Sequence, residues 1–143
     1  MNILLLGATG SIGDSVLSVI KENHSELNLF GITFHKNKNK SQEIIKDFKP
    51  EFAYVEDRST FEDLKVTSDI TFLNGDSSLK ELIEHDDVDV IISAISGFAG
   101  LKATYLAAST GKKILLANKE SIVAGGDLIT ACLLYTSPSP RDQ

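Results

Sequence analysis

Short apolar runs alternate with segments of helical periodicity along most of this chain. The apolar runs lie at 3–6, 27–34, 52–55, 70–73, 88–95 and 114–117, and each predicts a strand. Between and after them, apolar residues three and four positions apart predict helices over 11–23, 41–49, 59–64, 78–83, 96–109 and 121–129. Strands and helices that alternate in this way are typical of an α/β fold. We predict a doubly wound parallel sheet of about six strands, with helices on both faces.

Several helix boundaries are expected from capping residues. Ser41 is placed to cap the second helix, and Pro50 to stop it. Residues 59–62 and 78–81 match the capping box, in which Ser or Thr is followed three positions later by Glu. Gly111 stands where a glycine ends the helix that reaches residue 109.

A glycine-rich sequence, Gly-Ala-Thr-Gly-Ser-Ile-Gly at 7–13, joins the first predicted strand to the first predicted helix. In such a turn one glycine allows the tight bend, another lets the backbone approach a pyrophosphate, and a third lets helix and strand pack closely. The helix N-terminus offers N–H groups to phosphates, and Thr9 and Ser11 add hydroxyl donors. This context predicts a Rossmann-like dinucleotide-binding domain; a tight turn without a ligand is the other interpretation.

The end of the second predicted strand indicates which dinucleotide is bound. An NAD-binding protein has Asp or Glu about 20 residues after the glycine-rich loop, where it bonds the ribose 2′-OH. This chain has His35, Lys36 and Asn37 there, and these side chains suit a 2′-phosphate. The sequence therefore favours NADPH over NADH. We expect Lys38 and Lys40 to be solvated only.

Two further strand ends carry candidate chemistry. Small residues over 93–100 either leave room for a ligand or allow close helix packing. Asn118, Lys119 and Glu120 follow the last predicted strand and are expected to face the same crevice. Lys119 can pair with an anionic substrate, whereas Asn118 and Glu120 can bond the cofactor. Glu120 also suits the first turn of a helix.

Length and charge narrow the possible functions. A chain of 143 residues allows one ordinary domain. Its 14 Lys and Arg against 20 Asp and Glu give a net charge of -6, which argues against binding a nucleic-acid backbone. Cys132 is the only cysteine, so neither a disulfide framework nor a cysteine zinc site can form. Without a long apolar run or a leader-like N-terminus, we expect a cytoplasmic bacterial protein and no membrane partner.

The last 14 residues depart from this pattern. Two of the three prolines, Pro138 and Pro140, lie there together with Cys132, and the helical periodicity of 121–129 stops without a cap. We therefore predict that 1–129 is the domain. The segment 130–143 is expected to be a non-native tail, from a fusion scar, a frameshift or a read-through.

Three motifs together resemble 1-deoxy-D-xylulose 5-phosphate reductoisomerase: GATGSIG at 7–13, HKN at 35–37 and LLANKES at 115–121. The resemblance covers about residues 1–129, the family's N-terminal NADPH-binding domain. It implies roles for ten residues: NADPH binding by Thr9, Gly10, Ser11, Ile12, His35, Lys36, Asn37, Asn118 and Glu120, and substrate contact by Lys119. His35 stands where the family often has glycine.

The resemblance also implies an activity. The family converts 1-deoxy-D-xylulose 5-phosphate to 2-C-methyl-D-erythritol 4-phosphate with NADPH and Mg²⁺ or Mn²⁺, in isoprenoid synthesis by the non-mevalonate route. Its members are homodimers. The family's metal ligands lie in an Asp-Ser-Glu block a little beyond the helix predicted over 121–129, and the only acid after residue 129 here is Asp142. We therefore expect no catalytic residue and no metal ligand in this chain, which is expected to recognise NADPH without turning it over.

Other dinucleotide-binding classes share the glycine pattern. A short-chain dehydrogenase needs Tyr-x-x-x-Lys, but the residues four positions after the three tyrosines are Arg58, Ser109 and Ser139. A semialdehyde dehydrogenase needs a nucleophilic cysteine, and only Cys132 is available. A different reductase module or a non-catalytic dinucleotide sensor remains the alternative, although a sensor has no need of a lysine for substrate such as Lys119.

Overall fold

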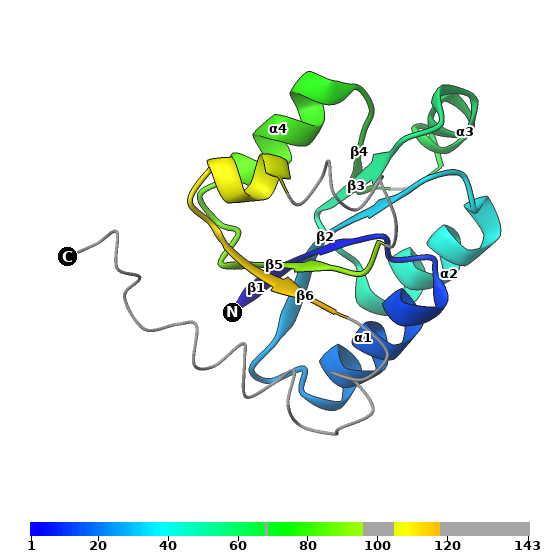
Figure 1. Ribbon diagram of the computed structural model, residues 1–143. Coiled ribbons are helices and arrows are strands. Elements are labelled where there is room, and N and C mark those ends of the chain that lie inside the picture. Colours follow the sequence, from blue (N-terminus) through cyan, green and yellow to red (C-terminus); the bar gives the residue numbers. More distant parts are fainter. Residues whose placement is uncertain (68, 96–104, 118–143) are drawn as a thin grey trace.

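The computed structural model describes residues 1–67, 69–95 and 105–117, in which a six-stranded parallel sheet lies between helices (Figure 1). The elements are β1 (Asn2–Leu6), α1 (Ser11–Glu22), β2 (Asn28–Phe34), α2 (Lys38–Phe48), β3 (Phe52–Val55), α3 (Arg58–Leu64), β4 (Thr71–Leu73), α4 (Asp76–Glu84), β5 (Val90–Ser93) and β6 (Lys113–Leu116). The strand order is β4-β3-β2-β1-β5-β6, and every neighbouring pair is parallel. The predicted α/β fold is confirmed.

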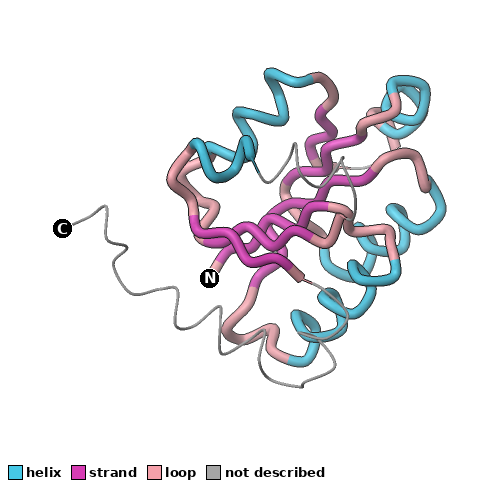
Figure 2. The backbone as a smooth tube through the Cα atoms, viewed as in Figure 1, coloured by secondary structure: helices cyan, strands magenta, loops and turns pink. Residues whose placement is uncertain are grey.

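Helices cover both faces of the sheet (Figure 2). On one face, Val16 of α1, Ile44 of α2 and Leu64 of α3 pack into a single apolar core. On the other face, Leu82 of α4 packs in a second core with Ala107, which belongs to a helical segment over 105–109. This two-sided arrangement is the predicted doubly wound architecture.

The central strand β1 belongs to both cores. Ile3 and Leu5 pack on the side of α1, whereas Leu4 and Leu6 pack on the side of α4, and all four side chains are fully buried. Because successive side chains of a strand point to opposite faces, a strand covered on both sides must be apolar at every position. This explains the continuous apolar run at 3–6.

Helix α2 begins earlier than the sequence predicts. Asn37 is its N-cap, and the Asn37 Oδ1 accepts a hydrogen bond from the Lys40 N–H at 3.1 Å. Ser41 is buried inside the helix, where its hydroxyl donates to the Lys38 carbonyl oxygen at 2.8 Å. The prediction of Ser41 as the cap is therefore wrong, because an amide oxygen four residues earlier already satisfies the first turn.

The two predicted capping boxes are also wrong. Asp57 caps α3, and its carboxylate accepts from the Thr60 N–H at 3.0 Å and from the Thr60 hydroxyl at 2.7 Å. Helix α4 starts directly after Gly75. Residues 59–62 and 78–81 therefore lie inside the helices. A capping box requires its Ser or Thr to stand outside the helix.

Strand β5 is shorter than the apolar run at 88–95. It pairs with β1 from Ile3 opposite Val90 to Leu6 opposite Ser93, and β1 itself ends at Leu6. The length of the partner strand therefore limits β5. Gly111 follows the helical segment over 105–109 with φ +79°, which confirms it as the residue that ends this helix. The predicted helix over 121–129 and the segment 130–143 lie outside the described residues.

Candidate cofactor-binding site

The strand order defines one edge at which a ligand can bind. Strand β1 lies between β2 and β5, so the chain moves outward from β1 in one direction up to β4 and then returns to the other side of β1 at β5. In open α/β sheets, ligands bind at the carboxyl ends of the strands where the direction changes in this way. The glycine-rich loop leaves β1 at this edge.

Each glycine of the loop meets a different steric requirement. Gly7 has φ +79°, and a Cβ placed on it lies 2.6 Å from the Ile95 side chain. A Cβ on Gly13 lies 2.5 Å from the Ala8 carbonyl oxygen, so only glycine lets α1 pack this closely. At Gly10 the nearest atom is 3.9 Å away. Gly7 and Gly13 are therefore required by the fold, whereas Gly10 leaves its backbone open to a ligand.

The loop is attached to the neighbouring strand β2 by Thr33. The Gly7 N–H lies 3.1 Å from both the carbonyl oxygen and the hydroxyl oxygen of Thr33, and the Ala8 N–H donates to the same carbonyl at 2.9 Å. Thr33 is buried. These bonds hold the first half of the loop at the carboxyl edge.

Helix α1 points its N-terminus into this region. Gly10 is the N-cap, with extended backbone and no side-chain cap, and the Asp14 N–H donates to the Gly10 carbonyl at 3.0 Å. The N–H groups of a first helical turn have no partner within the helix, and they carry a partial positive charge. Thr9 and Ser11 flank this end, whereas the Ile12 side chain packs against the core, so only its backbone can serve a ligand.

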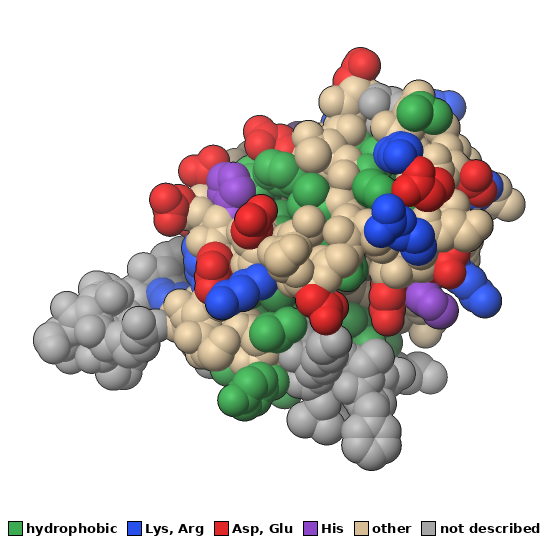
Figure 3. Space-filling view, turned by 90° about the horizontal axis from the view of Figure 1, so that it is seen from above, with side chains coloured by type: hydrophobic (Ala, Val, Ile, Leu, Met, Phe, Trp, Pro, Cys, Tyr) green, Lys and Arg blue, Asp and Glu red, His purple; other side chains and the backbone are tan. Residues whose placement is uncertain are grey.

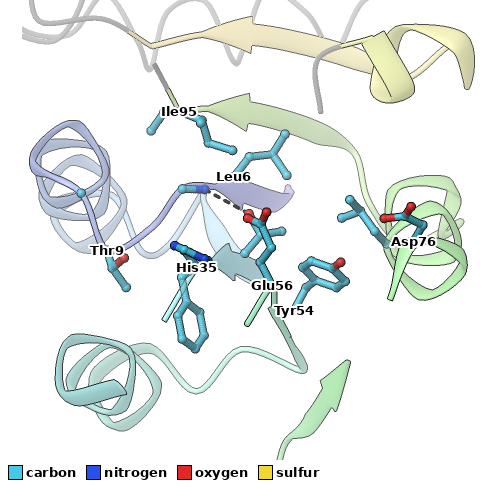
Figure 4. Close-up of a pocket in the computed structure, with 13 residues that line it drawn as sticks. Leu6, Thr9, His35, Tyr54, Glu56, Asp76 and Ile95 are labelled. Atoms are coloured by element: carbon cyan, nitrogen blue, oxygen red, sulfur yellow. Dashed lines mark hydrogen bonds between the residues drawn. The ribbon is translucent and has the colours of Figure 1, made fainter. Parts of the chain in front are cut away.

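A cavity of about 510 Å³ opens at the same edge. It is lined by Leu6, Gly7, Thr9, Gly10, Thr33, Phe34, His35, Tyr54, Glu56, Asp76, Leu79, Ala94 and Ile95. Thr9 lies on one side beside α1, Asp76 lies on the opposite side on α4, and His35 and Glu56 lie between them (Figure 4). The volume is within the usual range for small-molecule and cofactor sites.

The turn at 35–37 reaches one rim of this cavity through His35. His35 lines it, whereas Lys36 does not belong to the lining, and all three side chains are exposed. The Asn37 Oδ1 is used as the cap of α2, so its Nδ2 is the group that can donate to a phosphate. The structure thus places His35 at the same cavity as the glycine-rich loop, and Lys36 follows it in the chain; the 2′-phosphate site itself stays a prediction.

A carboxylate stands close to this rim. Hydrogen bonds from Thr60 hold the pKa of Asp57 below its ordinary value, and electrostatic interactions with His35 and Lys36 lower it further. Asp57 is therefore ionised at neutral pH, within electrostatic reach of the predicted 2′-phosphate site. No motif in the sequence marks this residue as part of the site.

The sequence predicts that Lys38 and Lys40 are only solvated, but in the structure both lysines form ion pairs. The Lys38 Nζ lies 3.0 Å from Asp63 Oδ2, and the Lys40 Nζ lies 2.6 Å from Asp14 Oδ1. The prediction is wrong because both lysines face acids on helices that are distant in sequence and adjacent in the fold.

The sequence motifs also do not include three polar residues that line the cavity: Tyr54, Glu56 and Asp76. Glu56 directly follows β3, so the rule that strand carboxyl ends face the crevice identifies it once β3 is placed in the sheet. Burial raises the pKa of Tyr54, and the charge of Asp76 raises it further. No local sequence pattern places Asp76 here, because it reaches the cavity from the start of α4.

The remaining predicted residues lie mostly beyond the described chain. Ala94 and Ile95 line the cavity, whereas 96–100 lie outside the described residues. Asn118, Lys119 and Glu120 also lie outside them. The Ala117 N–H donates to the Ser93 carbonyl oxygen at 2.9 Å, so the chain leaves β6 at the carboxyl edge of the sheet.

Several other ionisable residues of the described chain lie at the opposite, amino edge of the sheet. The Asn2 N–H donates to Asp89 Oδ2 at 2.7 Å, so this acid lies at the amino edge of the sheet, where β1 begins. His85 lies there too, and its Nδ1 accepts from the Asp87 N–H at 3.0 Å. Within residues 1–67, 69–95 and 105–117, no three His, Cys, Asp or Glu side chains approach one another closely enough to bind a metal ion.

The described surface and helices give two further observations. On the face shown in Figure 3, acidic and basic side chains are intermixed and do not gather by sign. Among the helices that the structure describes, none combines the length and apolar composition needed to cross a membrane.

The comparisons with known proteins point to one family. Residues 3–126 match the family model described as 1-deoxy-D-xylulose 5-phosphate reductoisomerase. A protein of that name from Francisella tularensis subsp. novicida (strain U112) is 48% identical over 128 residues, which are 89% of this chain and 33% of the relative. Another, from Ruthia magnifica subsp. Calyptogena magnifica, is 39% identical over 129 residues, which are 89% of this chain and 34% of the relative. The chain thus spans about a third of the length of these relatives.

Solved structures show the same fold. A reductoisomerase crystallised with NADPH, fosmidomycin and magnesium superposes with a TM-score of 0.75 and 37% identity, over 92% of this chain and 33% of that one. The enzyme from Zymomonas mobilis in complex with NADPH gives a TM-score of 0.71 and 34% identity, over 93% of this chain and 36% of that one. Because the family model matches residues 3–126, which are most of this chain, the chain belongs to the 1-deoxy-D-xylulose 5-phosphate reductoisomerase family.

Proposed function

We propose that this chain forms the NADPH-binding domain of a 1-deoxy-D-xylulose 5-phosphate reductoisomerase. The observation that carries the proposal is that one cavity is lined both by Gly10, with its open backbone at the N-terminus of α1, and by His35, which begins the basic turn at 35–37. A dinucleotide phosphate requires this set: N–H donors for the pyrophosphate and cations for the 2′-phosphate. The NADPH complexes of two relatives support it.

The described residues fit the cofactor. Thr9, Gly10, Ser11 and Ile12 supply N–H and hydroxyl donors for the pyrophosphate and ribose. Lys36 supplies the positive charge for the 2′-phosphate, while His35 and Asn37 add donors. The rest of the cavity, toward Tyr54, Glu56 and Leu79, is left for the adenosine end. In this role the chain binds and orients the cofactor, and NADPH supplies a hydride when it is bound.

For the whole protein we propose the family's reaction, the NADPH- and metal-dependent isomerisation and reduction of 1-deoxy-D-xylulose 5-phosphate. Lys119 attracts the substrate's phosphate, and Asn118 and Glu120 bind the cofactor. The described residues offer no donor set for Mg²⁺ or Mn²⁺. We therefore assign them no metal-dependent step, and expect no turnover by the 143-residue chain alone. The whole protein is proposed to be a cytoplasmic homodimer.

We further propose that residues 1–129 are the domain and that 130–143 are a non-native tail. The family match, which ends at residue 126, supports this boundary. Deleting 133–143 is expected to shift the melting temperature by no more than a few degrees, because a segment that buries little surface contributes little to stability. A large drop on deletion contradicts the boundary.

The proposal is tested by titrating the 143-residue protein with NADPH and with NADH, following the fluorescence of the reduced nicotinamide. We expect saturable binding of NADPH and at least tenfold weaker binding of NADH, because only NADPH offers a 2′-phosphate to Lys36. Equal affinity for the two dinucleotides contradicts the NADPH assignment. No binding of either contradicts the proposed function.

A further inference from the structure

One ion pair joins the two helices that follow the two predicted phosphate sites. Asp14 is in the first turn of α1, the helix that begins at the pyrophosphate site. Lys40 is in the first turn of α2, the helix that begins after the 2′-phosphate site. The Lys40 Nζ lies 2.6 Å from the Asp14 Oδ1, which is the distance of a charge-assisted hydrogen bond.

Both partners are also attached to residues of the phosphate sites. The Asp14 N–H donates to the Gly10 carbonyl oxygen at 3.0 Å. The Lys40 N–H donates to Asn37 Oδ1 at 3.1 Å, within the cap of α2. Hydrogen bonds therefore connect Gly10, Asp14, Lys40 and Asn37 in series, from one predicted phosphate site to the other.

The ion pair also determines the net charge beside the predicted pyrophosphate site. An unpaired Asp14 carboxylate in the first turn of α1 stabilises the helix but repels a nearby pyrophosphate. The Lys40 ammonium, held against it, neutralises this charge. The hydrogen bond and charge of Asp14, with a further contribution from Glu43, raise the pKa of Lys40, so the Lys40 ammonium stays charged at neutral pH.

Lys38 provides an internal comparison, because it lies in the same turn of α2 and has the same charge. Its partner Asp63, at 3.0 Å, is on α3. Lys38 therefore connects α2 to a helix that carries no predicted phosphate site. The two lysines differ mainly in what they connect.

We propose that Asp14 and Lys40 form a positioning pair, which fixes the spacing between the pyrophosphate site at Gly10 and the 2′-phosphate site at 36–37 and so favours a ligand that spans both. The inference rests on the proposed NADPH binding. A ligand that occupies only one of the two sites does not depend on their spacing.

The test compares Lys40→Met with its matched control Lys38→Met in the 143-residue protein. The ligands are NADPH, which spans both sites, and adenosine 2′-monophosphate, which reaches only the second. We expect Lys40→Met to weaken NADPH binding about three- to tenfold, the size of coupling a partly exposed ion pair can transmit. We expect Lys38→Met to change it less than about twofold, and binding of the monophosphate to change less than about twofold in both variants.

A double-mutant cycle isolates the pair itself. In the Asp14→Asn background, where the pair is already broken, Lys40→Met is expected to have less than about a twofold effect on NADPH. Melting temperatures of all variants are expected to stay within a few degrees of the parent protein, because an exposed pair adds little to stability.

Three results overturn the inference. The first is an equal effect of Lys40→Met and Lys38→Met on NADPH, and the second is an equal effect of Lys40→Met in both backgrounds. The third is an equal loss of NADPH and monophosphate binding, which assigns Lys40 to direct attraction of phosphate. If the parent protein does not bind NADPH at all, the proposed function fails and the inference fails with it.

Discussion

The backbone N–H of Asp57 donates to the carbonyl oxygen of His35 at 2.9 Å. The residue that caps α3 therefore also holds the turn that follows β2, on the side away from α1. The Asp57 carboxylate is used at the same time by the N–H and hydroxyl of Thr60. The start of α3 and the rim of the cofactor site are thus built as one unit.

This arrangement predicts a pH dependence of stability. The ordinary pKa of an Asp carboxyl is 3.8, and hydrogen bonds from Thr60 lower it in the folded protein. A lowered folded pKa stabilises the protein above the unfolded value, and the benefit is lost as pH falls through the folded value. The parent protein should therefore lose its advantage over Asp57→Asn only below about pH 4. Urea unfolding between pH 2 and 7 measures this difference, which should not change above about pH 5.

Thr60→Val is the matched variant for that experiment. It removes the hydroxyl that donates to Asp57 and keeps the backbone donor, so the pKa of Asp57 should move back toward 3.8. The pH at which the advantage disappears should then rise. An advantage over Asp57→Asn that persists at the lowest pH contradicts the role given to the carboxylate.

Lys36 is expected to determine the preference for NADPH. A charge-assisted hydrogen bond contributes about 1.5–3 kcal/mol, so Lys36→Ala should weaken NADPH binding roughly 10- to 100-fold and leave NADH binding almost unchanged. Parallel titrations with the two dinucleotides measure this. Lys46→Ala, which removes the same charge from the last turn of α2, is the control and should affect neither. Equal losses of NADPH and NADH binding would mean that Lys36 acts through the stability of the fold or through the overall electrostatic field of the protein.

Gly10 and Gly13 should separate binding from folding. A methyl group at Gly10 meets no atom closer than 3.9 Å, so Gly10→Ala should keep the melting temperature and strongly reduce NADPH binding by occupying the space of the phosphate. At Gly13 the methyl lies 2.5 Å from the Ala8 carbonyl, so Gly13→Ala should destabilise the protein by about 1–3 kcal/mol. Thermal unfolding and NADPH titration of both variants test the distinction. Normal NADPH binding by Gly10→Ala places the phosphates elsewhere.

Thr33 is expected to stabilise the glycine-rich loop. Its hydroxyl oxygen accepts from the Gly7 N–H at 3.1 Å, and Thr33→Val removes this acceptor with little change of shape. The loss should be about 0.5–1.5 kcal/mol of unfolding free energy, with weaker NADPH binding. Thr71→Val, at an exposed position of β4, is the control and should stay within about 0.5 kcal/mol. If both variants behave alike, the Thr33 hydroxyl has no special role in the loop.

Local physical chemistry explains which predictions were confirmed. The run at 3–6 predicts a strand buried on both faces because every position must be apolar, and β1 has this environment. The glycine-rich loop is predictable because Gly7 and Gly13 satisfy requirements set within a few residues of the chain, apart from the contact of Gly7 with Ile95. The predicted cap at Ser41 and the two predicted capping boxes were wrong because each helix begins earlier in the chain. A side-chain acceptor just upstream caps α2 and α3, and α4 begins directly after a glycine.

The sequence by itself determined the alternation of strands and helices, the sheet type and the position of the phosphate loop, since each depends on periodicity or on glycine sterics over short distances. Only the tertiary structure decided which charges meet. Asp14 faces Lys40, Asp57 stands beside His35 and Lys36, and Glu56 reaches the cavity because the order β3-β2-β1 brings their loops to one edge. Coulomb interactions depend on separation in space, and residues far apart along the chain acquire that separation only when the strands have been ordered.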